Sequence, residues 1–456
     1  MAIGMVWRAP NFTCAFFLRF DGFCDFFLAM RLRSPLVLIP DIPYGWSSFW
    51  QVLPAYTQAL ESLGALPLRL NPFAHVSTKD LGQALEASYW VIPYRALSSG
   101  GVDLAKNLTH GLGRRPPLVV VSNGEGARGG IFLQRNSRFF STADIFLTAC
   151  RAEARLLKKA FPKLNFVFHR GIPVAQPKPF SKATLSKWRS SHGFRSGDKI
   201  LLYAGRLSRQ KNILALLESF SHVRVREPRS QLVLLGAPDL LGEPHLPSRP
   251  EEAYGLQLAR EVARLGLSGA VHFMGSVGQE ELALWLASCD LHLSLTTHFG
   301  EDFGYSIAQG MAHGAPTLVT KWGGGLDFIE GGGAAGIPVS IDRKGKPTVS
   351  PLRAARAIEA ALEAPPHRLG RRGRHFYRAN LSFSSFGNFW RSQVEPAVRE
   401  SLQQRGEPLR PDPMQRRLLL SLQRRLDLGG GAHLFSSPRD SLYQLICRSY
   451  LGSRTL

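Results

Sequence analysis

The sequence predicts an α/β protein built from two parallel sheets, and three observations support this fold class. Short apolar runs of strand length alternate with longer helical stretches along most of the chain. The alternation falls into two blocks, which a proline-bearing linker near Val174–Lys182 separates. The 456 residues and 44% hydrophobic content permit two or three domains with complete cores.

Each block supplies a series of expected strands. In the first block the apolar runs are Pro35–Ile39, Leu66–Leu70, Trp90–Pro93, Leu118–Ser122, Ile145–Thr148 and Asn165–Phe168. In the second block they are Ile200–Ala204, Gln231–Leu235, Val271–Met274, Asp290–Leu295, Pro316–Thr320 and Ile337–Val339. Helical stretches such as Trp50–Leu63 and Ala152–Ala160 lie between strands, which is typical of parallel sheets.

The loop after the strand at Ile200–Ala204 carries the cations of interest. Gly205 and Arg206 follow the strand directly, and Lys211 precedes an apolar run at helical spacing. Arg and Lys side chains at such a place can hold a diphosphate by charge-assisted hydrogen bonds. The alternative is a pair of solvated surface cations, in a chain with 56 Lys and Arg residues.

A second loop has the chemistry that complements the first. Between the strands at Asp290–Leu295 and Pro316–Thr320 lie Glu301, Gly304 and a short helix. The first N–H groups of a helix attract anions, and the Glu301 carboxylate can accept hydrogen bonds from sugar hydroxyls. The combination suits a sugar nucleotide, whereas the alternative is an ordinary strand-turn-helix with a solvated Glu301.

These segments resemble a known family. The sequences GRLSRQKN at Gly205–Asn212, VHFMGSV at Val271–Val277 and GEDFGYSIAQGMAHGAP at Gly300–Pro316 resemble the donor half of retaining GT-B glycosyltransferases of the GT4 family, the glycosyl transferases group 1. WGG at Trp322–Gly324 and HRGIP at His169–Pro173 add to the resemblance. It implies two Rossmann-like domains that face an inter-domain cleft.

The resemblance implies a domain organisation for the middle of the chain, and the residues themselves characterise the two ends, which the resemblance does not cover. An N-terminal appendage would cover residues 1–33, an acceptor domain residues 34–175 and a donor domain residues 176–375. Residues 376–400 would form a helix that crosses back to the first domain, and residues 401–456 a basic tail. Within the tail, Gln415–Leu428 is amphipathic and suits either an anionic membrane surface or docking on the protein.

The resemblance assigns roles to individual residues. Arg206 and Lys211 match the pair that binds the donor diphosphate, and Glu301 matches a carboxylate that contacts the donor sugar. These three are the expected catalytic residues. The remaining expected donor-binding positions are Gly45, Gly205, Gly275, Phe303, Gly304, Tyr305 and Gln309.

Two positions depart from the family pattern. Gln309 stands where the family carries a second Glu for the ribose hydroxyls, and an amide lacks charge-assisted acceptance. Asn123 stands where a His is frequent, and Asn can orient a hydroxyl without acting as a base. Asn123, Trp46 and Glu125 are candidates for the acceptor side, although burial of Trp46 is an equal alternative.

Composition narrows the partners. The five scattered cysteines favour a reducing compartment, with Cys150 and Cys289 as buried thiols, and no metal-ligand spacing occurs. The net charge of +22 suits acidic lipids, a phosphorylated acceptor or nucleic acid. No nucleic-acid motif accompanies the charge, so we favour a peripheral membrane enzyme over a nucleic-acid binder. We therefore expect a cytoplasmic protein, peripheral to the membrane, that needs no cofactor or metal.

The expected function is transfer of a sugar from a UDP- or GDP-linked donor to a glycan or lipid-linked acceptor, with retention of configuration, in envelope polysaccharide biosynthesis. The alternative is a catalytically weak GT-B protein that binds a nucleotide sugar or acts as a scaffold. Gln309, in place of the usual Glu, is the feature that supports this alternative. A GT-B phosphorylase or a nucleotide-sugar epimerase is a lesser alternative within the enzymes.

Overall fold

The computed structural model describes residues 32–41, 49–93, 100–123, 133–238, 252–298, 301–343, 347–404, 406–410, 413, 417 and 449–451. The expected N-terminal appendage, residues 1–33, lies outside these ranges except for its last two positions. The described residues of the appendage join no helix or strand.

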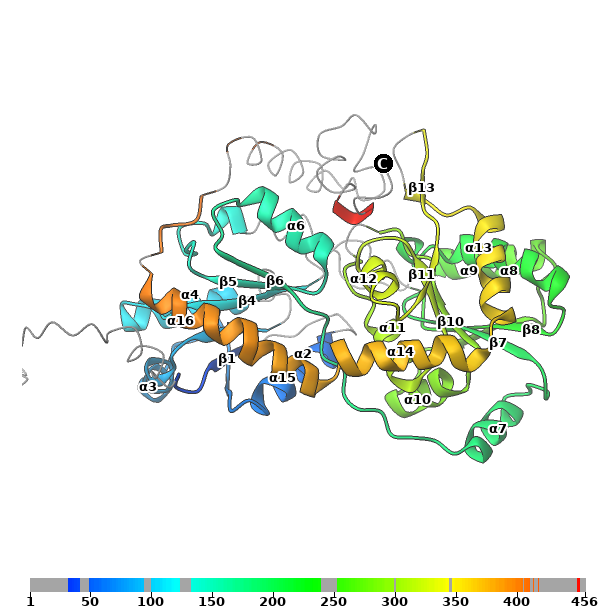
Figure 1. The fold of residues 1–456 in the computed structure, drawn as a ribbon, viewed down its shortest axis with the longest axis horizontal. Helices are drawn as coiled ribbons and strands as arrows, with labels where there is room; N and C mark the ends of the chain where they lie inside the picture. Colours follow the sequence, from blue (N-terminus) through cyan, green and yellow to red (C-terminus); the bar gives the residue numbers. More distant parts are fainter. Residues whose placement is uncertain are drawn as a thin grey trace, which may run out of the picture. The chain divides into compact units, whose positions relative to one another are not determined.

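The first half builds one parallel sheet (Figure 1). Its strands are β1 (Leu36–Pro40), β2 (Leu66–Leu70), β3 (Trp90–Ile92), β4 (Leu118–Ser122), β5 (Ile145–Thr148) and β6 (Phe166–His169). Its helices are α2 (Phe49–Glu61), α3 (Thr78–Glu86), α4 (Gly101–Leu112) and α6 (Arg151–Ala160). The strand order is β2-β1-β3-β4-β5-β6.

The second half builds another parallel sheet, in the order β12-β11-β10-β7-β8-β9. Its strands are β7 (Lys199–Ala204), β8 (Ser230–Leu235), β9 (Val271–Gly275), β10 (Leu291–Ser294), β11 (Thr317–Thr320) and β12 (Ala335–Ile337). Its helices are α7 (Lys182–Ser191), α8 (Ile213–Arg226), α9 (Glu252–Arg264), α10 (Gln279–Ser288), α11 (Tyr305–His313), α12 (Gly324–Glu330), α13 (Pro351–Glu363) and α14 (Pro366–Asn380). A small antiparallel pair, β13 (Ser340–Ile341) with β14 (Pro347–Thr348), is an addition that the sequence did not predict.

The predicted fold class is therefore confirmed, and each predicted strand is present within two residues of its expected bounds. The reason is visible in β7, where successive side chains point to opposite faces of the sheet. Leu201 and Tyr203 join one buried cluster with α8, whereas Ile200 and Leu202 join a second cluster with Trp285 of α10. Both faces of this second sheet are covered, as is typical of parallel sheets. Its strands are therefore continuous apolar runs in the sequence.

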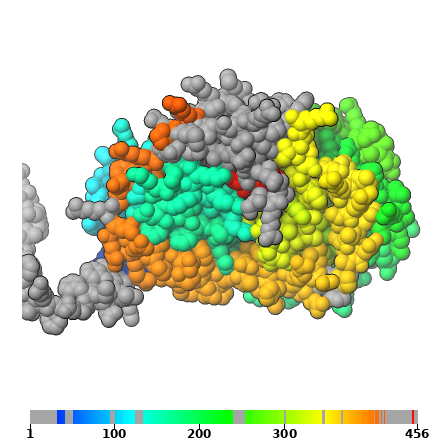
Figure 2. All heavy atoms as spheres, turned by 45° about the horizontal axis from the view of Figure 1, so that its top comes forward, coloured from blue at the N-terminus to red at the C-terminus, as the bar shows by residue number. Residues whose placement is uncertain are grey.

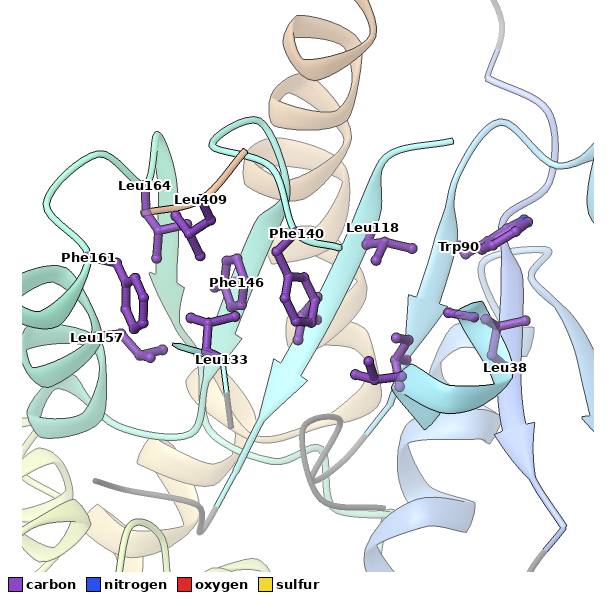
Figure 3. Close-up of a cluster of buried hydrophobic side chains, with 14 of the residues drawn as sticks. Leu38, Trp90, Leu118, Leu133, Phe140, Phe146, Leu157, Phe161, Leu164 and Leu409 are labelled. Atoms are coloured by element: carbon purple, nitrogen blue, oxygen red, sulfur yellow. The ribbon is translucent and has the colours of Figure 1, made fainter. Parts of the chain in front are cut away.

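The core of the first half is built in the same way. Leu38, Trp90 and Leu118 from three adjacent strands pack on one face of the sheet (Figure 3). Phe146 of β5 and Phe161, after α6, extend this cluster along the same face. Aromatic and β-branched runs on neighbouring strands thus bury one continuous apolar surface.

The chain returns to the first half after α14 (Figure 2). The expected single helix consists of α15 (Phe383–Phe389), a π-helical turn (Trp390–Val394) and α16 (Glu395–Gln403). Pro396 lacks the N–H that would continue the α-helical hydrogen bonds, which explains the irregular turn before it. Trp390 Nε1 donates to the Tyr89 hydroxyl at 3.0 Å, and the ring of Phe386 lies 5.8 Å from that of Tyr56.

One buried polar side chain in the second sheet has a physical consequence. His292 on β10 is fully buried, and its ring lies so close to Gly310 of α11 that a Cβ there would overlap Nδ1. Neither ring nitrogen has a hydrogen-bond partner among the described residues. Burial lowers the pKa of His292 to about 3, so the imidazole is neutral near pH 7.

This burial predicts a pH-dependent stability. Between the unfolded pKa near 6.5 and the folded value of about 3, the unfolded chain binds more protons than the folded one, so the free energy of unfolding falls as the pH is lowered. The slope that His292 contributes is at most about 1.4 kcal/mol per pH unit. We expect His292→Leu to flatten the dependence of unfolding free energy on pH between 6 and 4, as measured by urea titration.

The control is His222→Gln on α8, which removes a histidine whose side chain is exposed. An equal slope in the wild type and the His292→Leu variant would contradict the assignment.

Candidate active site

The two loops that the sequence singles out meet at one point of the second sheet. β7 and β10 are neighbours in the sheet although they are separated in the chain, so the strand order reverses between them. Ligands of such sheets bind outside the carboxyl ends of the strands, at this reversal. The loop with Arg206 and Lys211 leaves β7 there, and the loop with Glu301 leaves β10 there.

The turn after β7 is held tightly by its neighbours. Gly205 N–H donates to the Leu235 carbonyl at 2.9 Å, and a Cβ on Gly236 would overlap the Gly205 carbonyl oxygen. The Tyr203 hydroxyl donates to the Arg206 carbonyl at 2.8 Å, and burial raises the pKa of this hydroxyl, so it stays protonated. The half-buried Arg206 therefore starts from a fixed backbone.

Hydrogen bonds tie the segment around Lys211 to the end of β10. Lys211 closes a 3₁₀ turn (Arg209–Lys211), and Asn212 follows with a left-handed φ of 59°. Asn212 Nδ2 donates to the Leu295 carbonyl at 3.1 Å, and Thr296 Oγ1 donates to the Gln210 carbonyl at 3.1 Å. Asn tolerates the left-handed conformation better than most residues, which explains its place here.

Lys211 and Glu301 meet in an ion pair between the two loops. Their side chains are only 19% and 18% exposed, so the pair is largely removed from water. An isolated charge in such a place is costly, and in the pair each charge compensates the other. The structure thus brings together a cation and a carboxylate that lie 90 positions apart in the chain.

The start of α11 lies against the end of β7. Ser306 Oγ donates to the Ala204 carbonyl at 2.7 Å, and Gly304 caps the helix with a left-handed φ of 75°. The helix N-terminus therefore lies at the same strand ends as Glu301 and Arg206. Its unpaired N–H groups add partial positive charge there.

Two of the expected donor-binding side chains serve packing. Phe303 is buried, and its ring contacts that of Phe328 at 5.3 Å, while burial raises the pKa of the Tyr305 hydroxyl. Because both side chains are packed within the protein, a role toward a ligand would fall to their backbone N–H groups, as the family pattern implies. Gly275, at the end of β9, accepts from Gly236 N–H at 2.7 Å.

Gln309 lies on α11 and contacts α10. Its Nε2 donates to Gln279 Oε1 at 3.3 Å. Its Oε1 is buried and has no hydrogen-bond partner among the described residues. The amide thus has an unused acceptor, which is the capacity a ribose hydroxyl would need.

On the acceptor side the structure describes one of the expected residues. Asn123, at the end of β4, is 1% exposed and donates from Nδ2 to the Tyr56 hydroxyl at 2.6 Å. Gly45, Trp46 and Glu125 lie outside the described residues. The structure therefore supports only the burial and hydrogen bonding of Asn123 on this side.

A contact between the two halves was missed from the sequence. Arg151 begins α6, and its N–H and Nε donate to the Asp327 carboxylate at 2.9 and 2.7 Å, while its guanidinium pairs with Glu330 at 2.5 Å. Asp327 and Glu330 belong to α12 of the second half. The sequence gives only a weak signal for this contact, namely the spacing of Asp327 and Glu330 on α12.

Metal-ligating side chains do not gather in the described parts of the chain, where no three His, Cys, Asp or Glu residues form a group that suits an ion. The expected buried thiols are confirmed, because Cys150 and Cys289 are both buried and free. Burial raises the pKa of both thiols. They are therefore poor nucleophiles and poor metal ligands as they stand.

Comparison with known proteins agrees with this geometry. The model of the glycosyl transferases group 1 matches residues 186–376. Mannosylfructose-phosphate synthase of Agrobacterium fabrum is 34% identical over 146 residues, which cover 32% of this chain and 30% of that protein. Alpha-monoglucosyldiacylglycerol synthase of Streptococcus pneumoniae is 32% identical over 159 residues, 33% of each protein. The chain thus spans about a third of the length of these relatives.

A solved structure shows the fold over a longer stretch. Alr3699/HepE of Anabaena, crystallised with UDP and glucose, has a TM-score of 0.58 and 14% identity, over 80% of this chain and 100% of that one. The shared architecture of two parallel sheets extends well beyond the region of sequence similarity. Residues 186–376 therefore match the glycosyl transferases group 1, and the chain has the GT-B fold.

Proposed function

We propose that this protein is a retaining glycosyltransferase that moves a sugar from a UDP- or GDP-linked donor to a glycan or lipid-linked acceptor. The observation that supports this most is the meeting of Lys211, Glu301 and the α11 N-terminus at the strand reversal. A diphosphate needs positive charge, and a sugar needs hydrogen-bond acceptors, and these two requirements are met side by side. Similar proteins are named glycosyltransferases, which agrees with this proposal.

The reaction would depend on charge stabilisation. As the glycosidic bond breaks, negative charge develops on the leaving diphosphate, where Arg206, Lys211 and the helix N-terminus can stabilise it. Glu301, released from Lys211, would accept hydrogen bonds from the sugar hydroxyls. The anomeric configuration is retained if the acceptor hydroxyl attacks the anomeric carbon from the face that the diphosphate leaves. The leaving phosphate then takes the proton of that hydroxyl. These residues then need no separate base, which fits Asn123 in place of His.

The cations are tested by substitution. We expect Lys211→Ala and Arg206→Ala each to lower kcat for nucleotide release at least about a hundredfold, because removing one preorganised charge from a transition state costs about 3 kcal/mol. The measurement is nucleotide release from a panel of UDP- and GDP-sugars, with candidate acceptors.

Arg209→Ala is the matched control, because Arg209 lies on the same turn but stacks on Tyr254 at 4.8 Å. It should change kcat by no more than a few-fold. Turnover of the Lys211→Ala protein at the wild-type rate would show that this loop does not bind the diphosphate.

Gln309 supports a test of donor binding. We expect Gln309→Glu to lower the KM for the donor severalfold, because a charged acceptor makes hydrogen bonds about twice as strong as a neutral one. Gln309→Leu should raise KM at little cost in kcat. Steady-state kinetics with varied donor measures both, and an unchanged KM in the Leu variant would remove Gln309 from the site.

A catalytically weak protein that binds nucleotide sugars is the second candidate, and Gln309 is the observation that favours it. It predicts donor binding by calorimetry without nucleotide release for any acceptor. Release that depends on an acceptor excludes it.

We further propose that the protein works at an anionic membrane surface. No Asp or Glu occurs between Glu363 and Glu395, and α14 within this stretch places Arg368, Arg371, Arg372 and Arg378 on one exposed face. Like charges at these helical spacings repel one another, and anions near the arginine side chains reduce this repulsion. No described helix is long and apolar enough to cross a bilayer, so contact would be electrostatic.

Vesicle binding tests this surface. Arg368→Gln, Arg371→Gln and Arg378→Gln together should weaken binding to vesicles of phosphatidylcholine with phosphatidylglycerol about a hundredfold, since each cation near such a surface is worth about 1 kcal/mol. Binding to pure phosphatidylcholine should be weak for all proteins.

The control variant removes three exposed arginines elsewhere, Arg195, Arg260 and Arg353, and so has the same net charge as the α14 variant. Equal losses of vesicle binding in both variants would overturn the assignment to α14. The assignment would also be overturned if the α14 variant lost binding to DNA and kept its binding to vesicles.

A further inference from the structure

The last described residues of the chain are buried next to the candidate site. Ser449, Tyr450 and Leu451 form a helical turn, and Tyr450 is 0% exposed. In Figure 1 this red segment lies beside α12, and Gly323, which precedes α12, donates its N–H to the Tyr450 carbonyl. All strands of the two six-stranded sheets lie between Leu36 and Ile337, so the turn adds nothing to the sheet topology. Its burial therefore calls for another role.

Tyr450 holds the loop that precedes α12. Its carbonyl accepts from Gly323 N–H at 3.0 Å, and its ring lies 5.6 Å from that of Trp322. Gly323 has a φ of 52° and a ψ of −128°, which L side chains rarely adopt. A Cβ there would lie 2.9 Å from Cδ1 of Tyr450 and would overlap the Glu301 carbonyl oxygen. Gly323 is thus held between Tyr450 and Glu301.

The same loop supports the Glu301 turn through hydrogen bonds. Trp322 Nε1 donates to the His298 carbonyl at 2.8 Å, and Glu301 N–H approaches that same carbonyl at 3.1 Å. The His298 ring lies 3.2 Å from Gln210 Nε2, one residue before Lys211. A continuous set of contacts therefore runs from Tyr450 through Trp322 and His298 to both partners of the ion pair.

Three consecutive glycines, Gly323 to Gly325, follow Trp322. Glycine is the most permissive residue, so this loop has little stiffness of its own. The Tyr450 ring lies against Gly323 and Trp322 and so helps to define the position of this turn. A small shift of the loop would move the Glu301 carbonyl and with it the carboxylate.

We propose that Tyr450 is a positioning residue that holds Glu301 in place for the donor, and that it affects Lys211 only through the ion pair with Glu301. The proposal rests on the proposed function for its kinetic effect, although the contacts themselves do not. A misplacement of about 1 Å can cost on the order of a hundredfold in rate. We therefore expect Tyr450→Ala to lower kcat/KM for the donor ten- to a hundredfold, whereas Tyr450→Phe, which keeps the ring, stays within a few-fold of wild type.

A double-mutant cycle separates positioning from loss of stability. If Tyr450 acts through Glu301, adding Tyr450→Ala to Glu301→Ala causes no further loss in kcat/KM, whereas independent effects would multiply. Leu409→Ala is the control, because Leu409 belongs to the same buried cluster but lies outside the loop. It should lower the melting temperature without changing the KM for the donor. Multiplying losses would overturn the proposal.

Hydrogen exchange gives a readout that needs no activity. Tyr450→Ala, or Tyr450→Leu if the first variant does not fold, should speed exchange at least tenfold in the peptides that contain Glu301 and Gly323. Leu409→Ala should leave those peptides unchanged. Unchanged exchange in the Tyr450 variant overturns the proposal whether or not the protein is active. If the wild-type protein releases no nucleotide and the Tyr450 variant still exchanges faster, the proposed function is wrong and the positioning role of Tyr450 remains supported.

Discussion

The ion pair between Lys211 and Glu301 is the interaction on which the site depends. It joins two loops that leave neighbouring strands, and it exists because β7 and β10 are adjacent at the reversal of strand order. Two largely buried charges remain stable only while they are held together. The loops are therefore fixed from both sides, by Asn212 at the end of β10 and by Ser306 at the end of β7. Under the proposed function, a diphosphate that enters would take the place of Glu301 beside the same cation.

Close backbone approach is what allows this arrangement. Gly236 meets the carbonyl of Gly205 where β7 and β8 end, and Gly324 meets the carbonyl of Asp302 where the Glu301 turn begins. A methyl group at either place would push a loop away from the strand ends. Gly236 and Gly324 thus have a positional role in the second half, since each lets one loop rest directly on another.

The strands and both loops could be predicted because their signals are local. A buried parallel strand is a short apolar run, and a helix start after it carries Gly and acidic residues, as at Gly304 and Glu301. The partners of Gln309, Arg151 and Tyr450 could not be predicted, because each contact depends on how distant segments pack. Arg151 and Asp327 lie 176 positions apart, and nothing in either neighbourhood names the other. The irregular turn at Trp390–Val394 was also missed, since an aromatic stripe predicts a regular helix equally well.

The most direct test is a crystal structure of the protein with a nucleoside diphosphate bound. The account predicts the diphosphate at the carboxyl ends of β7 and β10, with phosphate oxygens within hydrogen-bond distance of Lys211 Nζ and the first N–H groups of α11. Glu301 should then have left Lys211 and be turned toward the place of the sugar. A nucleotide bound elsewhere, with the Lys211–Glu301 pair intact, would contradict it.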